Sequence, residues 1–171
     1  MPNWCENRVT ISGDAEDIVK FREVMEGPDH HGDDSIFSFN RLIPMPIELI
    51  DTTSPPTIKA TQAEVDDHNS TDIAVQNRTQ AVTQDTVNAL REKYGACDWY
   101  SWANNVWGTK WQPTEIELDV EEDDYLVYHF DTAWGPPEGI WGAILEQFPK
   151  LRVTWFYDEP GMQFCGYLGD K

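Results

Sequence analysis

Short stretches in which apolar and polar residues alternate recur along the chain, and this spacing is typical of half-buried β-strands. The first stretch runs from Arg8 to Ser12 and directs Val9 and Ile11 into a core. The last two cover Arg152–Tyr157 and Gln163–Leu168, on either side of a turn that contains Pro and Gly. The final stretch is therefore expected to pair back onto its neighbour as an edge strand.

Three more strands are predicted in the middle of the chain. Residues Ile36–Ile43 are mostly apolar and are followed by Pro44, which favours a second strand that ends there. Glu115–Val120 and Tyr125–Trp134 lie on either side of an acidic turn. These two segments together predict a hairpin.

Helical spacing of apolar residues marks two long segments. Asp14 is suited to cap a helix over Ala15–Met25, which a Gly-Pro pair then ends. A second helix is expected from the pair Pro136 and Pro137 to about Pro149, because Pro is favoured in the first turn of a helix. The apolar stripe of this helix consists of Ile140, Ile144, Leu145 and Phe148.

The chain from Ile47 to about Gly95 lacks the strand pattern. Thr52–Thr57 is rich in Thr, Ser and Pro and predicts a loop. Ala60–His68 and Thr83–Tyr94 have helical spacing. We interpret this stretch as a helical insertion.

The order of these elements predicts an α+β fold. The order is strand, helix, strand, helical insertion, strand or hairpin, helix and strand. This is the order of a ferredoxin-like split βαβ sandwich, with an antiparallel sheet and helices on one face. The insertion, at about residues 47–95, lies between the second strand and an aromatic-rich segment. Residues 1–171 are interpreted as a single domain, because one core suffices at this length and no linker or repeat divides the chain.

Composition limits the compartment and the cysteine chemistry. No apolar run approaches the roughly 20 residues of a membrane helix, and the first residues lack the features of a signal peptide, so a cytoplasmic location is expected. Cys5, Cys97 and Cys165 are far apart and form no CxxC pair. They are therefore expected to be reduced and mostly buried thiols.

The charge balance changes the functional expectations. The chain has 31 acidic and 12 basic residues, which gives a formal net charge of −19. Direct binding to nucleic acid or to anionic membranes is disfavoured, because both depend on clustered Lys and Arg. Three explanations of the acidity remain open: solubility, adaptation to a high-salt cytoplasm, or a surface that presents nucleic-acid-like charge to a basic partner.

Aromatic residues are densest between Tyr94 and Trp111. Such a segment suits the stacking of a base, a sugar or a peptide side chain, since Trp and Tyr offer flat apolar faces with a polar group. The alternative is that these rings simply belong to the core. The candidate binding residues in the segment are Trp99, Tyr100, Trp102, Trp107, Lys110 and Trp111.

Carboxylates are densest between Glu115 and Asp124. Alternate residues of a strand lie on one face, so Glu115, Glu117, Asp119 and Glu121 are expected to form a charged ribbon with a repeat of about 6.6 Å. The alternative is an ordinary wet sheet face, with the intervening Ile116, Leu118 and Val120 turned inward. The candidate acidic residues are Glu115, Glu117, Asp119, Glu121, Glu122, Asp123 and Asp124.

Sequence motifs in a fixed order run from residue 2 to about 168: Pro2-Asn-Trp-Cys-Glu-Asn7 with Val9-Thr-Ile-Ser-Gly13, Ser38-Phe-Asn-Arg-Leu-Ile-Pro-Met-Pro46, Tyr94-Gly-Ala with Asp98-Trp-Tyr, Trp107-Gly-Thr-Lys-Trp111, Phe130-Asp-Thr-Ala-Trp-Gly-Pro-Pro137 and Tyr157-Asp-Glu-Pro-Gly161. On these motifs the chain resembles the Api92-like family of phage and plasmid proteins, which carries a ferredoxin-like domain. The resemblance implies that fold and a mobile-element setting, and it supplies no catalytic residues. No motif covers Ile47–Ala81.

Few residues suggest catalysis or metal binding. His30 and His31 precede Asp33 and Asp34 in a polar loop, but their spacing matches no known ligand motif. His129 and Asp131 lie two apart on one strand, a spacing that suits acid/base chemistry and equally a structural histidine. We expect no cofactor, no metal and no catalytic site.

The sequence therefore favours a non-catalytic accessory protein that binds a protein partner with a basic surface. Its acidic surface would mimic nucleic acid and inhibit a host defence or nucleic-acid-handling protein, with the aromatic residues as anchors. Two alternatives stay open. One is a small-ligand or nucleotide-processing domain that uses the aromatic segment with Lys110 and His129. The other is a structural domain with a salt-adapted surface.

Overall fold

The computed structural model describes residues 3–28, 32–71 and 80–169 and divides the chain into two compact units. The first unit comprises Met1–Pro44 and Val106–Lys171, and the second comprises Met45–Asn105. The insertion expected at about residues 47–95 falls inside the second unit. No helix in the described ranges is long and apolar enough to cross a membrane.

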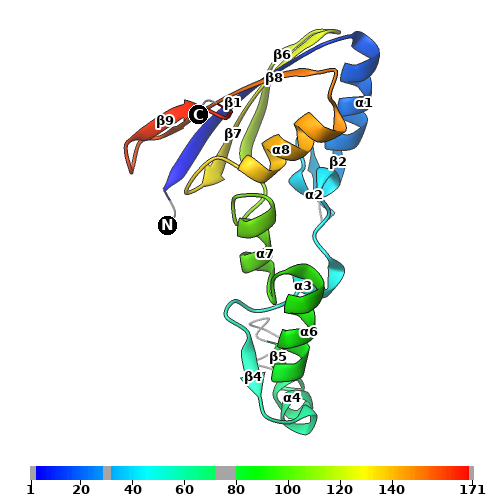
Figure 1. The fold of residues 1–171 in the computed structure, drawn as a ribbon, viewed down its shortest axis with the longest axis vertical. Helices are drawn as coiled ribbons and strands as arrows, with labels where there is room; N and C mark the ends of the chain where they lie inside the picture. Colours follow the sequence, from blue (N-terminus) through cyan, green and yellow to red (C-terminus); the bar gives the residue numbers. More distant parts are fainter. Residues whose placement is uncertain (1–2, 29–31, 72–79, 170–171) are drawn as a thin grey trace. The chain divides into compact units, whose positions relative to one another are not determined.

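The first unit is built on a five-stranded antiparallel sheet with the order β6-β7-β1-β8-β9 (Figure 1). One strand–helix–strand unit consists of β1, α1 and β6, and the other consists of β7, α8 and β8. In the sheet, β7 lies between β1 and β6, and β1 lies between β7 and β8, so each unit is split by a strand of the other. This is the predicted ferredoxin-like arrangement, with β9 added at one edge. The elements are β1 (Trp4–Ser12), α1 (Ala15–Met25), β2 (Gly27–Pro28), β3 (Asp34–Ser35), α2 (Phe39–Leu42), β6 (Thr114–Glu121), β7 (Tyr125–Ala133), α8 (Glu138–Gln147), β8 (Arg152–Glu159) and β9 (Phe164–Tyr167).

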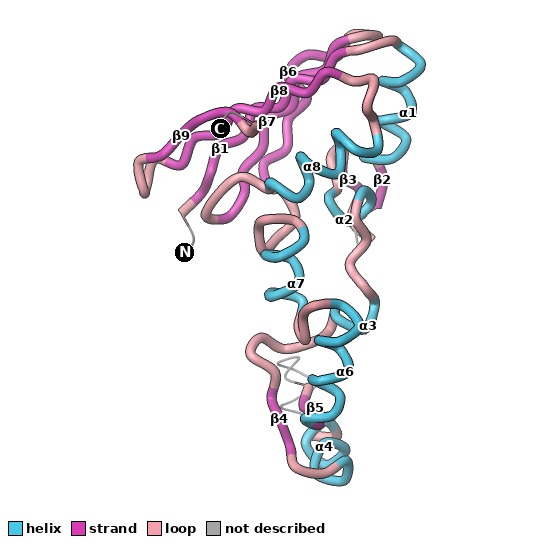
Figure 2. Tube along the Cα trace, viewed as in Figure 1, coloured by secondary structure: helices cyan, strands magenta, loops and turns pink. Residues whose placement is uncertain are grey.

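The helices α1, α2 and α8 lie on the same side of this sheet (Figure 2). Alternate residues of β1 face them: Val9 and Ile11 are fully buried, as predicted. Tyr128 on β7 lies opposite Val9, and its ring is 6.4 Å from that of Phe21 on α1. The core of the first unit therefore lies between the helices and one face of the sheet. No described helix of this unit covers the other face, which we call the open face.

A buried asparagine joins the three central strands. The Asn7 side chain on β1 donates to the carbonyl of Cys5 and to Oγ1 of Thr132 on β7, both at 2.8 Å. Its Oδ1 accepts from Nε1 of Trp155 on β8 at 3.0 Å. Because a buried polar group is costly unless it is hydrogen-bonded, this network favours one register of β7 and β8 on β1.

The prediction of a strand over Ile36–Ile43 is wrong. Ser38 instead caps the short helix α2, with its hydroxyl accepting from the backbone N–H of Arg41. Phe37, Ser38 and Phe39 are all fully buried, which a strand with one wet face cannot achieve. The second strand of the plait is β6, so the insertion interrupts the chain between α1 and β6.

In its described residues, the second unit contains short helices and a small parallel pair of strands, β4 and β5, which the sequence pattern did not predict. Thr61 and Glu64 form a reciprocal capping box at the start of α4, and Gly95 in the left-handed conformation follows the end of α6. These local signals explain why both predicted helices of the insertion are confirmed. The elements are α3 (Ile47–Ile50), β4 (Thr57–Lys59), α4 (Gln62–Asn69), β5 (Ala81–Thr83), α6 (Gln84–Tyr94) and α7 (Trp99–Val106).

Candidate functional site

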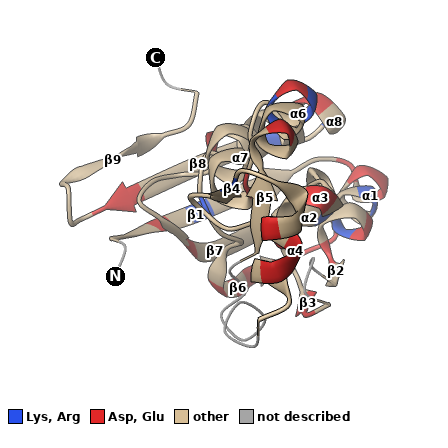
Figure 3. Cartoon of the chain, turned by 90° about the horizontal axis from the view of Figure 1, so that it is seen from below, with Lys and Arg blue, Asp and Glu red and all other residues tan. Residues whose placement is uncertain are grey.

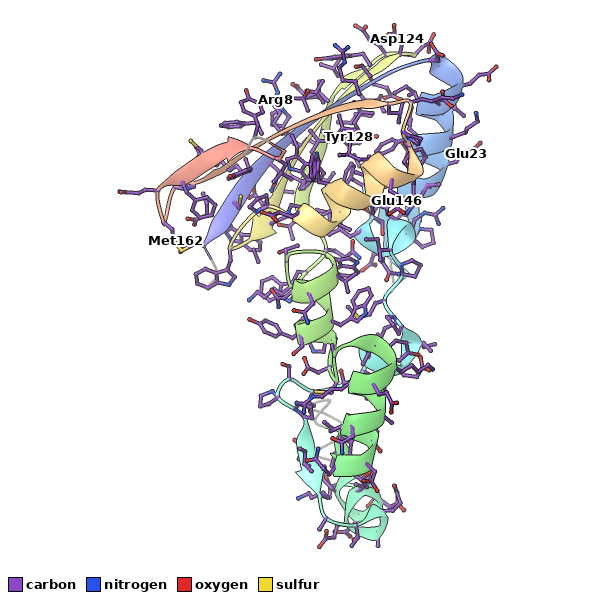
Figure 4. The ribbon with its side chains drawn as sticks, in the orientation of Figure 1. Arg8, Glu23, Asp124, Tyr128, Glu146 and Met162 are labelled. Atoms are coloured by element: carbon purple, nitrogen blue, oxygen red, sulfur yellow. The ribbon has the colours of Figure 1, made fainter. Side chains whose placement is uncertain are left out.

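The candidate site is the open face of the five-stranded sheet. In Figure 4, Arg8 and Tyr128 project to opposite sides of this sheet, with Tyr128 on the side of α8. The strand register places Asp131 of β7 opposite Glu6 of β1, and Glu6 opposite Asp158 of β8. We call these three residues, Asp131, Glu6 and Asp158, the acidic row. It crosses three neighbouring strands on the face opposite the helices.

The acidic row is electrostatically unfavourable. Like charges directly opposite each other on neighbouring strands are destabilising. Among the residues that the structure describes, no Lys, Arg or His lies within ion-pair distance of these three carboxylates. Burial raises the pKa of Asp131 above its usual value, and the neighbouring charges of Glu6 and Glu115 raise it further. Among the described residues, this concentration of negative charge is therefore not neutralised by an ion pair.

We expect Asp131→Asn to increase the free energy of unfolding at pH 7. Because the pKa of Asp131 is raised in the folded state, this carboxyl is protonated to a greater extent in the native than in the unfolded state over the pH range in which it titrates. The stability that Asp131 contributes is present below its pKa in the unfolded chain. It is lost as the pH rises through its pKa in the folded protein. The variant should be about 0.5 kcal/mol more stable at neutral pH, the size of one cross-strand charge pair. Urea unfolding followed from neutral pH down to about pH 4, the usual range of carboxyl pKa values, should show the difference shrink.

A matched control for this experiment is Glu146→Gln, which removes an exposed carboxylate from α8. It should change stability little at either pH, since isolated surface charges contribute little. Equal effects of the two substitutions would show that the charge of the whole protein, and not the acidic row, sets the pH dependence.

The strand β6 adds carboxylates at one side of the open face. Glu117 lies opposite His129, and Oδ2 of Asp119 is 3.8 Å from Nε2 of the same imidazole. Glu115, which contributes to the raised pKa of Asp131, has a positive φ of 51°. These three residues add negative charge to the β6 side of the open face, although at the level of the acidic row itself β6 carries Thr114 opposite Asp131.

The expected single ribbon of four carboxylates on β6 is wrong at its end. The pairing with β7 shifts between Thr114 and Glu117 and again between Leu118 and Val120. A bulge changes which face the following residues take. Beyond the second shift, Val120 lies opposite Val127, whose neighbour on β1 is Thr10 of the open face.

Glu121 leaves the ribbon as a result. Its carboxylate forms an ion pair with Arg22 of α1, which lies on the helix side of the sheet. The predicted inward position of Val120 is likewise wrong, while Leu118 lies opposite the buried Tyr128 as expected. Ile116, Leu118 and Val120 are all half-buried.

The remaining candidate carboxylates form the β6–β7 turn. Glu122 and Tyr125 exchange backbone hydrogen bonds, so Asp123 and Asp124 occupy the tip of a tight hairpin. All three acidic residues are exposed. They lie at the far end of the sheet from the acidic row, because β1 pairs Ser12 with Tyr125 and Glu6 with Asp131.

The aromatic segment is divided between the two units. Trp99, Tyr100 and Trp102 lie on α7 in the second unit, where Tyr100 is exposed and Trp102 is buried. Trp107 belongs to the first unit and is buried, with its indole N–H donating to the carbonyl of Ile43. The core interpretation therefore applies to Trp102 and Trp107.

Trp111 is the exposed aromatic of this segment in the first unit. Its ring is 6.2 Å from that of Trp4 at the start of β1, and Nζ of Lys110 lies 3.7 Å from the Trp111 ring centroid. Trp4 and Trp111 are 37% and 38% exposed, so large parts of both rings face solvent. Trp4 precedes Glu6 by two residues on the same face of β1, which places this aromatic pair beside the acidic row.

Of the candidates for metal binding, the structure describes Asp33 and Asp34, and the acid/base candidates His129 and Asp131 both lie on β7. His30 and His31 lie outside the described residues. Asp33 and Asp34 line a hollow of about 430 Å³ with Glu115. Across the described ranges, no group of three or more His, Cys, Asp or Glu is placed to hold a metal ion.

The three thiols differ in exposure: Cys5 and Cys97 are buried, and Cys165 is exposed. Burial raises the pKa of Cys5 to about 12, and the charges of Glu159, Asp158 and Asp131 contribute. The Cys5 thiol is therefore protonated and unreactive at neutral pH.

Glu6 and Asp158 are the site residues that sequence reasoning missed. Both stand in motifs quoted above, but their proximity depends on the pairing of β1 with β7 and β8. Figure 3 shows acidic positions on helices and strands alike. The acidic row is distinguished from these by its cross-strand alignment, which no local count of charges reveals.

Comparison with known proteins gives a family match for the part of the chain that contains β6, β7, α8, β8 and β9. Residues 106–169 match a family described as the ferredoxin-like domain in Api92-like protein. A stretch of 69 residues is 29% identical to the uncharacterized protein YubB of Escherichia coli strain K12, and covers 40% of this chain. The match spans 48% of the length of YubB.

The fold is also similar to a solved structure. The crystal structure of the protein api92 from Yersinia pseudotuberculosis aligns with a TM-score of 0.53 at 12% sequence identity. The alignment covers 98% of this chain and 93% of that one. At this identity the likeness establishes the fold alone.

Proposed function

We propose that this chain, a member of the Api92-like family through its ferredoxin-like domain, is a non-catalytic module that binds a basic segment of a partner protein on the open face of its sheet. The single observation that carries the proposal is the acidic row. Three carboxylates are aligned across neighbouring strands at a cost in stability, and within the described chain none of them forms an ion pair with a Lys, Arg or His. A partner's Lys or Arg side chains would supply the missing charge.

The aromatic pair of Trp4 and Trp111 supports the proposal that this face binds a partner. Interfaces are usually centred on a few desolvated aromatic or Arg side chains, surrounded by polar residues that exclude water. Trp4 and Trp111 are half-exposed and lie at the end of the sheet that carries the acidic row. Burying these rings would provide apolar contact, and the carboxylates would speed the encounter with a basic partner.

The chemistry of the partner follows from its charge. A protein that handles nucleic acid carries a basic surface that binds phosphates. A chain of net charge −19 would compete with nucleic acid for that surface. The strands that carry the acidic row are spaced by about 4.8 Å. The three carboxylates therefore form a compact negative patch and do not reproduce the extended spacing of phosphates along a nucleic-acid backbone. We propose a host nucleic-acid-handling or defence protein as the target, in keeping with the phage and plasmid setting that the family resemblance implies.

The test is affinity capture from host lysate with matched variants. The acidic-row variant carries Glu6→Gln, Asp131→Asn and Asp158→Asn. The control variant carries Glu23→Gln, Glu92→Gln and Glu146→Gln, which remove three exposed helix carboxylates and change the net charge equally. A protein that binds nucleic acid, retained at low salt by the wild type and the control but not by the acidic-row variant, is the expected result.

Two results would contradict the proposal. If both variants lose the same proteins equally, the binding follows net charge, and the alternative of a salt-adapted or merely soluble surface is favoured. If the retained protein has no basic surface, the acidic row is not the contact. Repeating the capture at high salt checks the mechanism, because screening should weaken a charge-dependent contact.

A further inference from the structure

A second feature of the open face is a hollow of about 320 Å³ between β1, β8 and β9. Tyr167 is the last residue of β9, and the pairing of β9 with β8 runs from Phe156 to Glu159. Thr154 on β8 therefore has no β9 partner at its side. The hollow is lined by Arg8, Thr10, Thr154, Phe156 and Tyr167.

Two aromatic rings form one wall of this hollow. Phe156 and Tyr167 lie opposite each other on β8 and β9, with ring centroids 5.3 Å apart and tilted by 59°. Tyr167 is 49% exposed, so its ring is accessible from solvent. Accessible aromatic faces of this kind stack well on a flat ring of a ligand.

Arg8 provides the charged group of the hollow. It lies opposite Phe156 on one side and His129 on the other. Within the described ranges, no carboxylate lies at ion-pair distance from its guanidinium, although the chain has 31 acidic residues. A guanidinium presents a rigid fork of donors that matches a carboxylate or a phosphate oxygen pair.

Two hydroxyls complete the arrangement. Thr10 and Thr154 lie directly opposite each other on β1 and β8, two residues along from Arg8 and Phe156. At about 6.6 Å, twice the rise of a strand, they lie within the span of a small ligand that reaches Arg8. Hydroxyls donate as well as accept, so both can bind an anionic oxygen.

From this geometry we propose that the hollow binds a small flat ring that carries one negatively charged group, either a carboxylate or a phosphodiester. The ring lies against Phe156 and Tyr167, and the charged group contacts the guanidinium of Arg8. The volume of about 320 Å³ suits a ligand of this size. A single charge is favoured because the acidic row lies one step along the strands, at Glu6 and Asp158.

The experiment is a titration of the isotopically labelled chain, observed by the backbone amide resonances of Thr10, Thr154 and Tyr167. The probes are 4-hydroxybenzoate and cyclic adenosine monophosphate, with phenol and adenosine as their uncharged counterparts. We expect saturable shifts from at least one charged probe, with a Kd of the order of 1 mM or below. Arg8→Gln should weaken this binding about tenfold, the value of one charge-assisted hydrogen bond.

The matched control is Arg152→Gln, which removes an exposed arginine from the same sheet face at the Ser12 end of β8. It should leave the titration unchanged. A response to 4-hydroxybenzoate alone would identify a carboxylate ligand, and a response to the cyclic nucleotide alone would identify a phosphodiester. Failure of both probes to saturate, or equal binding by Arg8→Gln, would overturn the proposal.

This site is separable from the proposed protein interface. The acidic-row variant retains Arg8 and both aromatic rings, and it removes negative charge near the hollow. It should therefore bind the anionic probe as well as or better than the wild type while losing the partner protein. Loss of probe binding in that variant would contradict the separation of the two sites.

Discussion

Gly139→Ala is expected to destabilise the protein by about 3 kcal/mol, close to the upper end for overpacked sites. A Cβ at this position of α8 would lie 1.8 Å from the carbonyl oxygen of Val106 and 2.8 Å from its carbonyl carbon. Backbone atoms cannot move aside as a side-chain end can. The backbone N–H of Gly139 also donates to the carbonyl of Trp107 at 3.2 Å, so the substitution would separate this bonded pair.

The same close approach is evident from the opposite segment, at Gly108. Gly108 has a φ of 88°, and a Cβ there would lie 2.8 Å from the backbone nitrogen of Glu138. Residues 106–108 and the start of α8 therefore approach each other through backbone alone. Trp107, which lies in the first of these segments and is buried, would be displaced when this approach is blocked.

The same helix offers a control for this experiment. A Cβ at Gly142 would have no atom within 4 Å. Gly142→Ala should stabilise the protein by about 0.5–1 kcal/mol, because Gly is unfavourable inside a helix. Urea unfolding followed by circular dichroism would measure both. A midpoint of Gly139→Ala equal to that of the wild type would show that the close approach is not part of the folded state.

The acidic-row variant is expected to gain stability and lose affinity. Glu6→Gln, Asp131→Asn and Asp158→Asn remove two directly opposed like-charge pairs, which should raise the free energy of unfolding by about 1 kcal/mol at neutral pH. The same substitutions remove the charges proposed to meet a basic partner. Affinity for the captured partner should fall about a hundredfold or more, since close charge pairs at interfaces have coupling energies of about 1.5 kcal/mol and above.

This opposite response distinguishes a binding surface from a merely soluble one. The control variant with Glu23→Gln, Glu92→Gln and Glu146→Gln should show small changes in both quantities, because isolated surface charges contribute little. In the acidic-row variant, the association rate constant should fall by a larger factor than the dissociation rate constant rises, if the charges act by long-range attraction of the partner. An acidic-row variant that is less stable than the wild type would contradict the electrostatic account, and unchanged affinity would contradict the proposed interface.

Part of the site could be anticipated from the sequence. The clusters at Trp99–Trp111 and Glu115–Asp124 are visible as local composition. Within them the structure separates exposed members such as Trp111 and Glu117 from buried or paired ones such as Trp107 and Glu121. Two shifts of register between β6 and β7 decide which of the β6 carboxylates lie on the open face. No local sequence pattern predicts these shifts.

The sequence by itself determined the elements whose signals are local. Thr61 caps α4, Gly95 follows α6 in the left-handed conformation, and Val9 and Ile11 alternate with polar neighbours on β1. Asp14 occupies the predicted N-cap position of α1, but its side chain makes no capping hydrogen bond. Capping, alternation and left-handed glycine act within a few residues, so they can be read along the chain.

Tertiary structure decided the rest, because the deciding energies come from contacts between distant residues. Ile36–Ile43 has the composition of a strand, but burial of Phe37 and Phe39 with rings of the sheet turns it into a loop and a helical turn. The acidic row exists only because β1 lies between β7 and β8. Residues 6, 131 and 158 are far apart in sequence, and only the register of three antiparallel strands brings their charges together.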